Sequence, residues 1–113
     1  MAFYSKVVGV AFENPDGSSR QQYIKDYCFS SQPLILKREP NNRYDKNAVG
    51  VWIKRKVFLF FESEIQIGYL SAELAEDIAE CMDSGGTVEA CISEITGGTA
   101  EHPTIGVKIS IST

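Results

Sequence analysis

Short apolar segments separated by turn-forming residues are the feature that most restricts how this chain folds. Apolar and polar residues alternate over residues 105–111 and again over 88–92, which is the period of a strand with one buried face. Shorter apolar segments occupy residues 34–36 and 48–53 and are bounded by proline, asparagine or lysine. No apolar run reaches the ~20 residues that a membrane-spanning helix needs. The spacing predicts a mainly β fold with α additions, arranged as a small antiparallel barrel.

Other segments are also expected to be extended. They cover residues 3–12, 57–61 and 65–70, with a turn or an exposed edge at residues 54–56. Residues 20–29 remain ambiguous, and one interpretation is a short helix capped by Ser18 or Ser19.

One helix is predicted clearly, over residues 71–83. Its apolar residues recur every four positions, and two glycines follow it. Ser71 is a suitable N-cap, and acidic residues in the first turns favour the helix dipole. The predicted apolar stripe consists of Leu70, Leu74, Ile78 and Met82.

Length and composition indicate a single globular domain over residues 1–113. Hydrophobic residues make up 43% and charged residues 23%, which excludes a disordered tail or a disulfide miniprotein. The three cysteines, Cys28, Cys81 and Cys91, form no CxxC pair. Together with the absence of a visible signal peptide, they favour reduced thiols in a cytoplasmic protein with no membrane partner.

The net charge of −4 conceals an uneven distribution along the chain. Residues 1–60 hold ten of the eleven lysines and arginines and five of the fifteen acids, a balance of +5. Residues 61–113 have a balance of −9. The overall negative charge disfavours non-specific nucleic-acid binding, which relies on cations, but it leaves room for a local basic groove.

The densest polar stretch, residues 38–49, joins two predicted strands and is therefore a loop held by a rigid scaffold, where binding residues are common. Its amides donate and accept hydrogen bonds, its cations suit phosphates, and its tyrosine suits base stacking. Its carboxylate can accept from a sugar hydroxyl or a base amino group. The alternative is a turn in which Asn and Asp side chains bond their own backbone. The candidate residues are Asn41, Asn42, Arg43, Tyr44, Asp45, Lys46 and Asn47.

Motifs of enzymes are absent from the sequence. It contains no P-loop, no GxSxG elbow and no HExxH helix, and its single histidine, His102, lies in an evident loop. The scattered cysteines lack metal-ligand spacing, so no metal or other cofactor is expected. The consecutive apolar residues 58–61 cannot all face one core, so either both faces of this strand are covered or one side meets a partner.

The chain resembles the HIRAN domain family in three segments. These are KVVGV at residues 6–10, REPNN-x-YDKNAV at 38–49, and QIGYL followed by ELA at 66–75. The resemblance implies a six-stranded barrel related to the OB-fold, with two helices. It also implies binding of single-stranded DNA, notably at a free 3′-hydroxyl end, in a DNA-repair or replication context.

The resemblance also suggests roles for individual residues. Asn41, Asn42, Tyr44 and Asp45 would line the DNA pocket, and Phe12 would stack a terminal base opposite Tyr44. Tyr69 occupies a position that is often histidine in the family and joins the candidate site. Two basic positions of the family are Ala11 and Ala72 here, which removes phosphate contacts.

Taken together, these features favour a non-enzymatic nucleic-acid-binding module whose partners are single-stranded DNA or DNA ends, with a helicase or nuclease supplied by another protein. Two other functions remain open. One is a protein-interaction module that pairs residues 58–61 with another chain. The other is a metal-dependent hydrolase that uses Asp45.

Overall fold

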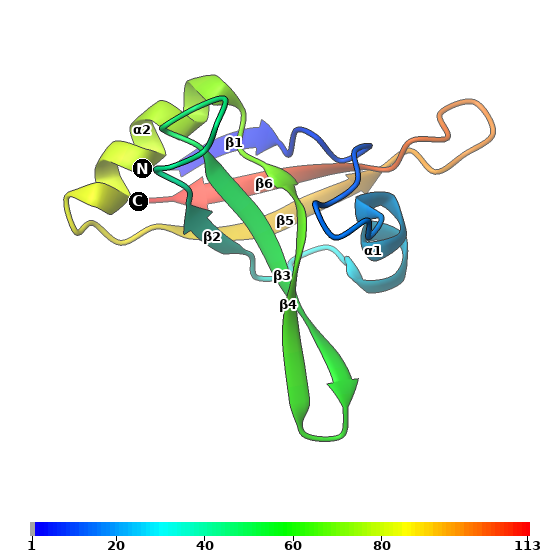
Figure 1. Ribbon diagram of the computed structural model, residues 1–113. Helices are drawn as coiled ribbons and strands as arrows, with labels where there is room; N and C mark the ends of the chain where they lie inside the picture. The colour runs from blue at the N-terminus through cyan, green and yellow to red at the C-terminus, as the bar shows by residue number, and fades with distance from the viewer. Residues whose placement is uncertain (1) are drawn as a thin grey trace.

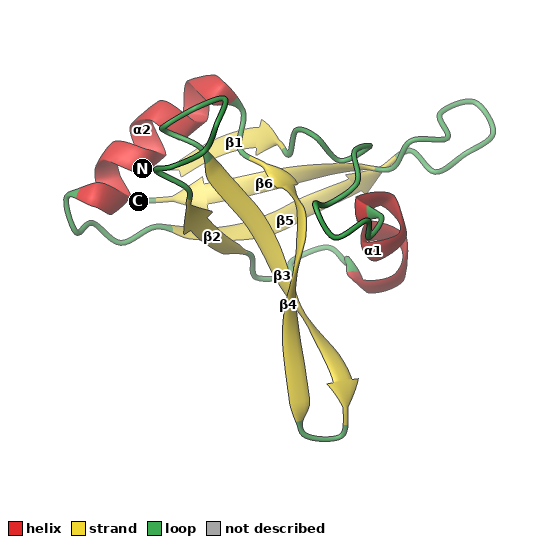
Figure 2. Ribbon diagram, viewed as in Figure 1, coloured by secondary structure: helices red, strands yellow, loops and turns green. Residues whose placement is uncertain are grey.

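The computed structural model describes residues 2–113, which form six strands and two helices (Figures 1 and 2). The bounds of the elements are β1 Ala2–Lys6, α1 Arg20–Tyr27, β2 Ile35–Arg38, β3 Val49–Phe58, β4 Phe61–Tyr69, α2 Ala72–Asp83, β5 Glu89–Thr96 and β6 Gly106–Ser112. The mainly β composition with two helices agrees with the sequence prediction.

The strands form two antiparallel three-stranded sheets, in the orders β1-β6-β5 and β2-β3-β4. Isolated bridges join the sheets at both margins, between Val8 and Tyr69 and between Pro33 and Cys91. Within the described residues, the two sheets do not close into a barrel, because these single bridges replace continuous ladders. The six predicted strands are present, whereas the predicted barrel is not confirmed. At one margin Gly9, with φ +74°, turns the chain away after Val8. At the other, Pro33 has no N–H to donate.

The turn at Gly9 also corrects the strand expected over residues 3–12. Only Ala2–Lys6 pairs as β1, and the chain then turns, with the Phe12 amide donating to the Gly9 carbonyl at 3.2 Å. The segment after β1 is consequently free to form one wall of a cavity instead of extending the sheet.

The hydrophobic core lies between the two sheets, as the alternation of apolar residues predicts. Along β6, Val107, Ile109 and Ile111 are buried and the residues between them are not, the pattern expected of a strand with one covered face. Both sheets and both helices contribute fully buried side chains, which include Val49, Val51, Ile53, Ile67, Ile92, Ile24 and Ile78.

Both helices occur where the sequence indicated them. The ambiguous segment forms α1, and the Ser19 hydroxyl accepts from the Gln22 amide at 3.1 Å, so Ser19 is the cap. Helix α2 begins after Ser71, but that serine makes no side-chain capping hydrogen bond. The buried face of α2 consists of Ala75, Ile78 and Ala79, with Leu74 and Met82 half-buried at its margins.

The β3–β4 hairpin differs most from expectation. Residues 54–56, predicted as a turn or edge, lie inside β3, and residues 62–64 lie inside β4. The hairpin leaves the body of the molecule and projects away from it (Figure 1). Its turn therefore lies at residues 59–60, and its tip carries the exposed side chains Val57, Phe58, Leu59, Phe60 and Phe61.

The three cysteines are free and half-buried. Burial raises the pKa of the Cys28 thiol to about 12, so this thiol is a poor nucleophile near neutral pH. In the part of the chain that is described, no helix has the length and apolar character to cross a membrane.

Candidate nucleic-acid interface

The loop between β2 and β3 is held by its own side chains. Asn42 Oδ1 accepts hydrogen bonds from the amides of Tyr44 at 2.9 Å and Asp45 at 3.1 Å. Asp45 Oδ1 accepts from the Asn47 amide at 2.8 Å. The turn interpretation of these Asn and Asp side chains is therefore confirmed, and it leaves the Tyr44 ring and the second Asp45 oxygen available for binding.

Arg38 anchors this loop to helix α2. Its Nη1 donates to the carbonyls of Lys46 at 3.2 Å and Ala48 at 2.9 Å, while Nε and Nη2 bind the Asp83 carboxylate at 2.9 and 3.0 Å. The hydrogen bond from Arg38 lowers the pKa of Asp83 below its usual value. The loop is thus fixed to a helix end, which preorganises the side chains that it presents.

A cavity of about 530 Å³ opens beside the loop. Four segments distant in sequence form its walls: the chain after β1, the start of α1, the β2–β3 loop, and the end of β4 with the start of α2. Its lining residues are Val8, Glu13, Pro15, Arg20, Asn42, Arg43, Tyr44, Asp45, Ala48, Tyr69, Leu70 and Ala72.

The structure brings together five of the nine candidate residues. Those that line the cavity are Asn42, Arg43, Tyr44, Asp45 and Tyr69. The others, which lie outside the lining, are Phe12, Asn41, Lys46 and Asn47.

The aromatic candidates differ in exposure. The Tyr44 side chain is 90% exposed, and the Arg43 guanidinium lies 6.0 Å from the centre of its ring. Phe12 is 71% exposed and belongs to the segment that supplies Val8 and Glu13 to the cavity wall. Both rings therefore present faces on which a planar group can stack.

Tyr69 forms the inner aromatic surface of the cavity. Its hydroxyl donates to Glu39 Oε1 at 3.0 Å, and the same oxygen accepts from Asn42 Nδ2 at 3.0 Å. Burial raises the pKa of the Tyr69 phenol, so the hydroxyl stays protonated as a donor at neutral pH. Glu39 therefore ties the inner surface of the cavity to the loop.

The sequence patterns did not single out Glu39 and Arg20 as candidate site residues. Glu39 lies in the polar stretch, but its link to Tyr69 spans 30 positions, so local patterns carry no sign of it. Arg20 is only 6% exposed, whereas arginine is usually found at the surface. Only the acceptors that surround it in the fold reveal its place.

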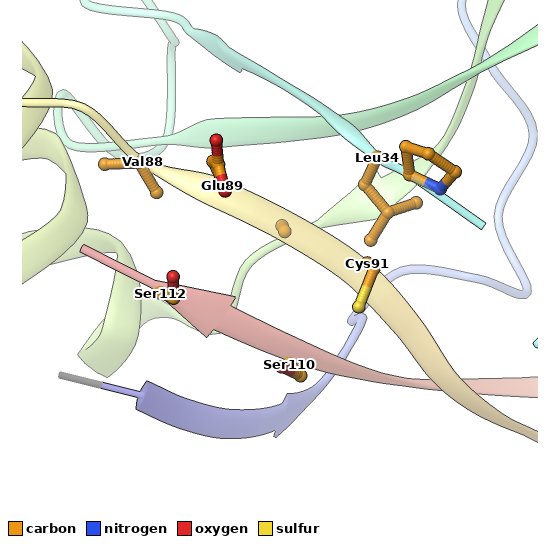
Figure 3. A pocket seen from close by; sticks show the side chains of 8 residues that line it. Leu34, Val88, Glu89, Cys91, Ser110 and Ser112 are labelled. Atoms are coloured by element: carbon orange, nitrogen blue, oxygen red, sulfur yellow. The ribbon is translucent and has the colours of Figure 1, made fainter. Parts of the chain in front are cut away.

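A second cavity, of about 450 Å³, lies where β5 and β6 approach the start of β2 (Figure 3). Leu34, Val88 and Cys91 are among its lining residues, and none of the nine candidates lines it. Across residues 2–113, no group of three or more His, Cys, Asp or Glu side chains is placed to hold a metal ion.

Comparisons with known proteins support a family assignment. The family model described as the HIRAN domain matches residues 1–113. Among curated proteins, none matches the chain. The crystal structure of the HIRAN domain of human HLTF is similar, with a TM-score of 0.64 and 22% identity, covering 97% of this chain and 72% of that one. A crystal structure of a Lactobacillus plantarum protein has a TM-score of 0.67 and 17% identity, covering 100% and 98%.

Proposed function

The chain belongs to the HIRAN domain family, and on that premise we propose that the cavity beside the β2–β3 loop binds nucleic acid, as single-stranded DNA with a free 3′-hydroxyl end. This function is binding and not catalysis. It suits DNA repair or replication, in which a helicase or nuclease supplied by a partner performs the chemistry.

The observation that carries the proposal is the position of Tyr44. Its ring is almost fully exposed at a cavity that also presents the Asp45 carboxylate and the Tyr69 ring. A terminal nucleotide needs this combination, since its base stacks on an aromatic face while its sugar requires hydrogen-bond acceptors. Exposure of the apolar ring face to water is unfavourable in the unbound protein. A base stacked on the ring removes that surface from water.

Asp45 supports the preference for a hydroxyl end. One of its carboxylate oxygens accepts from the Asn47 amide, and within the described residues the other oxygen has no hydrogen-bond partner. A free carboxylate oxygen accepts well from a hydroxyl group and repels a phosphate. The hydrogen bond from the Asn47 amide holds the carboxylate in place, which favours discrimination between a hydroxyl end and a phosphate end.

Fluorescence anisotropy with two labelled oligonucleotides, one ending in a 3′-hydroxyl and one in a 3′-phosphate, tests the proposal. We expect the phosphate to weaken binding because it places like charges together. Asp45→Asn preserves an acceptor for the Asn47 amide and removes the charge, so it should reduce the difference between the two ends. Equal affinity of the unmodified protein for both ends would exclude 3′-hydroxyl recognition, and a matching RNA oligonucleotide measures the selectivity for DNA.

The hairpin tip favours a second candidate function, protein interaction. Its side chains form an apolar surface of the kind that marks contact sites. This function predicts a protein partner that stays bound at high salt, with no change in anisotropy on addition of DNA. Removing an apolar tip side chain would weaken that complex and leave the cavity unchanged.

A further inference from the structure

A buried arginine lies in the cavity wall without a charged partner. Arg20 is 6% exposed, and its hydrogen-bond acceptors are both neutral: Asn14 Oδ1 at 2.7 Å from Nε and the Gly9 carbonyl at 2.9 Å from Nη1. Among residues 2–113, no carboxylate lies within 4.0 Å of its guanidinium. A buried guanidinium without a counter-ion is unfavourable unless an anion accompanies it.

The surroundings of Arg20 orient the guanidinium and leave donors unused. A guanidinium has five N–H groups, and the described contacts use two of them. Nη2 donates to no described residue, and it is not sealed from solvent. The Tyr69 ring lies 5.4 Å from the guanidinium carbon and limits how the group can turn. The remaining donors are therefore preorganised for a ligand in the cavity.

The start of helix α2 provides a second source of positive potential in the same cavity. Ala72, the first residue of α2, lines the cavity together with Arg20. The side chain of Ser71 makes no capping hydrogen bond, so the first amides of the helix lack the usual side-chain acceptor. Helix N-termini of this kind favour anions.

From these contacts we propose that Arg20 and the N-terminus of α2 form a phosphate subsite, which holds a phosphodiester group of the strand bound at Tyr44. The inference rests on the proposed nucleic-acid function and assigns the anionic part of the ligand within it. The guanidinium fork matches the geometry of a phosphate, with two parallel N–H···O bonds. Arg20 acts as a binding residue that also braces the loop through Gly9 and Asn14.

The test uses a short oligothymidylate in which a neutral methylphosphonate replaces one phosphodiester at a time. For the unmodified protein, neutralising the linkage held by Arg20 should weaken binding about tenfold, as expected for losing a charge-assisted hydrogen bond. In Arg20→Gln the same replacement should have no further effect. If every linkage behaves identically in both proteins, Arg20 holds no phosphate.

Lys25→Gln is the matched control. It removes a cation from an exposed position of the same helix, outside the lining of this cavity, so binding should still weaken about tenfold on neutralisation of the same linkage. Loss of this sensitivity in Lys25→Gln as well would show that the effect follows the overall charge and not Arg20, and would overturn the subsite.

A titration with inorganic pyrophosphate needs no variant. In nitrogen-15 NMR spectra of the unmodified protein, the Arg20 Nε–Hε resonance and the first amides of α2 should shift. No shift at either place overturns the inference. If pyrophosphate shifts these resonances while no oligonucleotide binds, the subsite stands and the proposed nucleic-acid function fails. If DNA binds and Arg20 is silent in both experiments, the function stands and the subsite fails.

Discussion

At the scale of single residues, we expect Tyr44 to contribute most to the proposed binding. Because its ring is 90% exposed and the loop is held by the backbone contacts of Asn42 and Asp45, Tyr44→Ala should leave the fold intact. Losing one base–aromatic stack should weaken single-stranded DNA binding by about 1–3 kcal/mol. Anisotropy titrations measure the affinity, and circular dichroism checks the fold.

Tyr4→Ala is the matched control for this prediction. Tyr4 is 78% exposed on β1 and does not line the cavity, so its loss should leave the affinity unchanged. Equal losses in Tyr44→Ala and Tyr4→Ala would mean that DNA contacts tyrosines without regard to the cavity.

At the scale of elements, α2 supports the site through packing. Ile78 is 1% exposed, so Ile78→Ala should lower the free energy of unfolding by about 2–5 kcal/mol through the cavity that it leaves. Leu74→Ala should cost less, because Leu74 is only half-buried. Denaturant unfolding measures both, with the exposed Glu76→Ala as the control. An unchanged midpoint for Ile78→Ala would mean that α2 does not pack on the core as described.

The β3–β4 hairpin should behave as an independent surface. Phe60 is 90% exposed at the tip, so Phe60→Ser should change the stability by no more than about 0.5 kcal/mol. The variant should also bind less of a hydrophobic dye such as ANS, since the exposed apolar area falls. Affinity for DNA should not change, because the tip does not line the cavity. A large loss of stability would contradict the exposed placement of the tip.

For the whole molecule, net charge limits the dependence of binding on salt. The protein carries −4, and the cations that line the cavity are Arg20 and Arg43. Two phosphate contacts on a single strand correspond to a slope of about −1.4 in a plot of log affinity against log salt concentration. Anisotropy titrations over a series of salt concentrations measure this slope.

Lys56→Gln provides the control for the salt series. Lys56 is exposed on the projecting hairpin, so its loss should leave the slope unchanged. A much steeper slope for the unmodified protein, made shallower by Lys56→Gln, would show that DNA binds along the basic hairpin and not in the cavity.

Local sequence determined much of this fold. The alternation of apolar residues in β6, the four-residue stripe of α2 and the polar loop before β3 depend on residues a few positions apart, so their structures follow from local chemistry. The side chains of the loop that suit binding also lie in one continuous stretch. For that reason Tyr44 and Asp45 could be selected from the sequence, and the structure places both at the cavity.

Only the tertiary structure decided how distant segments meet. Burial of Arg20 depends on Gly9 and Asn14, and Asn14 in turn donates to the Gln66 carbonyl, 52 positions away. The bridge from Val8 to Tyr69 joins the two sheets and positions the inner wall of the cavity. These contacts depend on the three-dimensional approach of chain segments, and no local period encodes that approach. Local sequence thus specified the loop that is proposed to bind, while the tertiary structure specified the buried charge behind it.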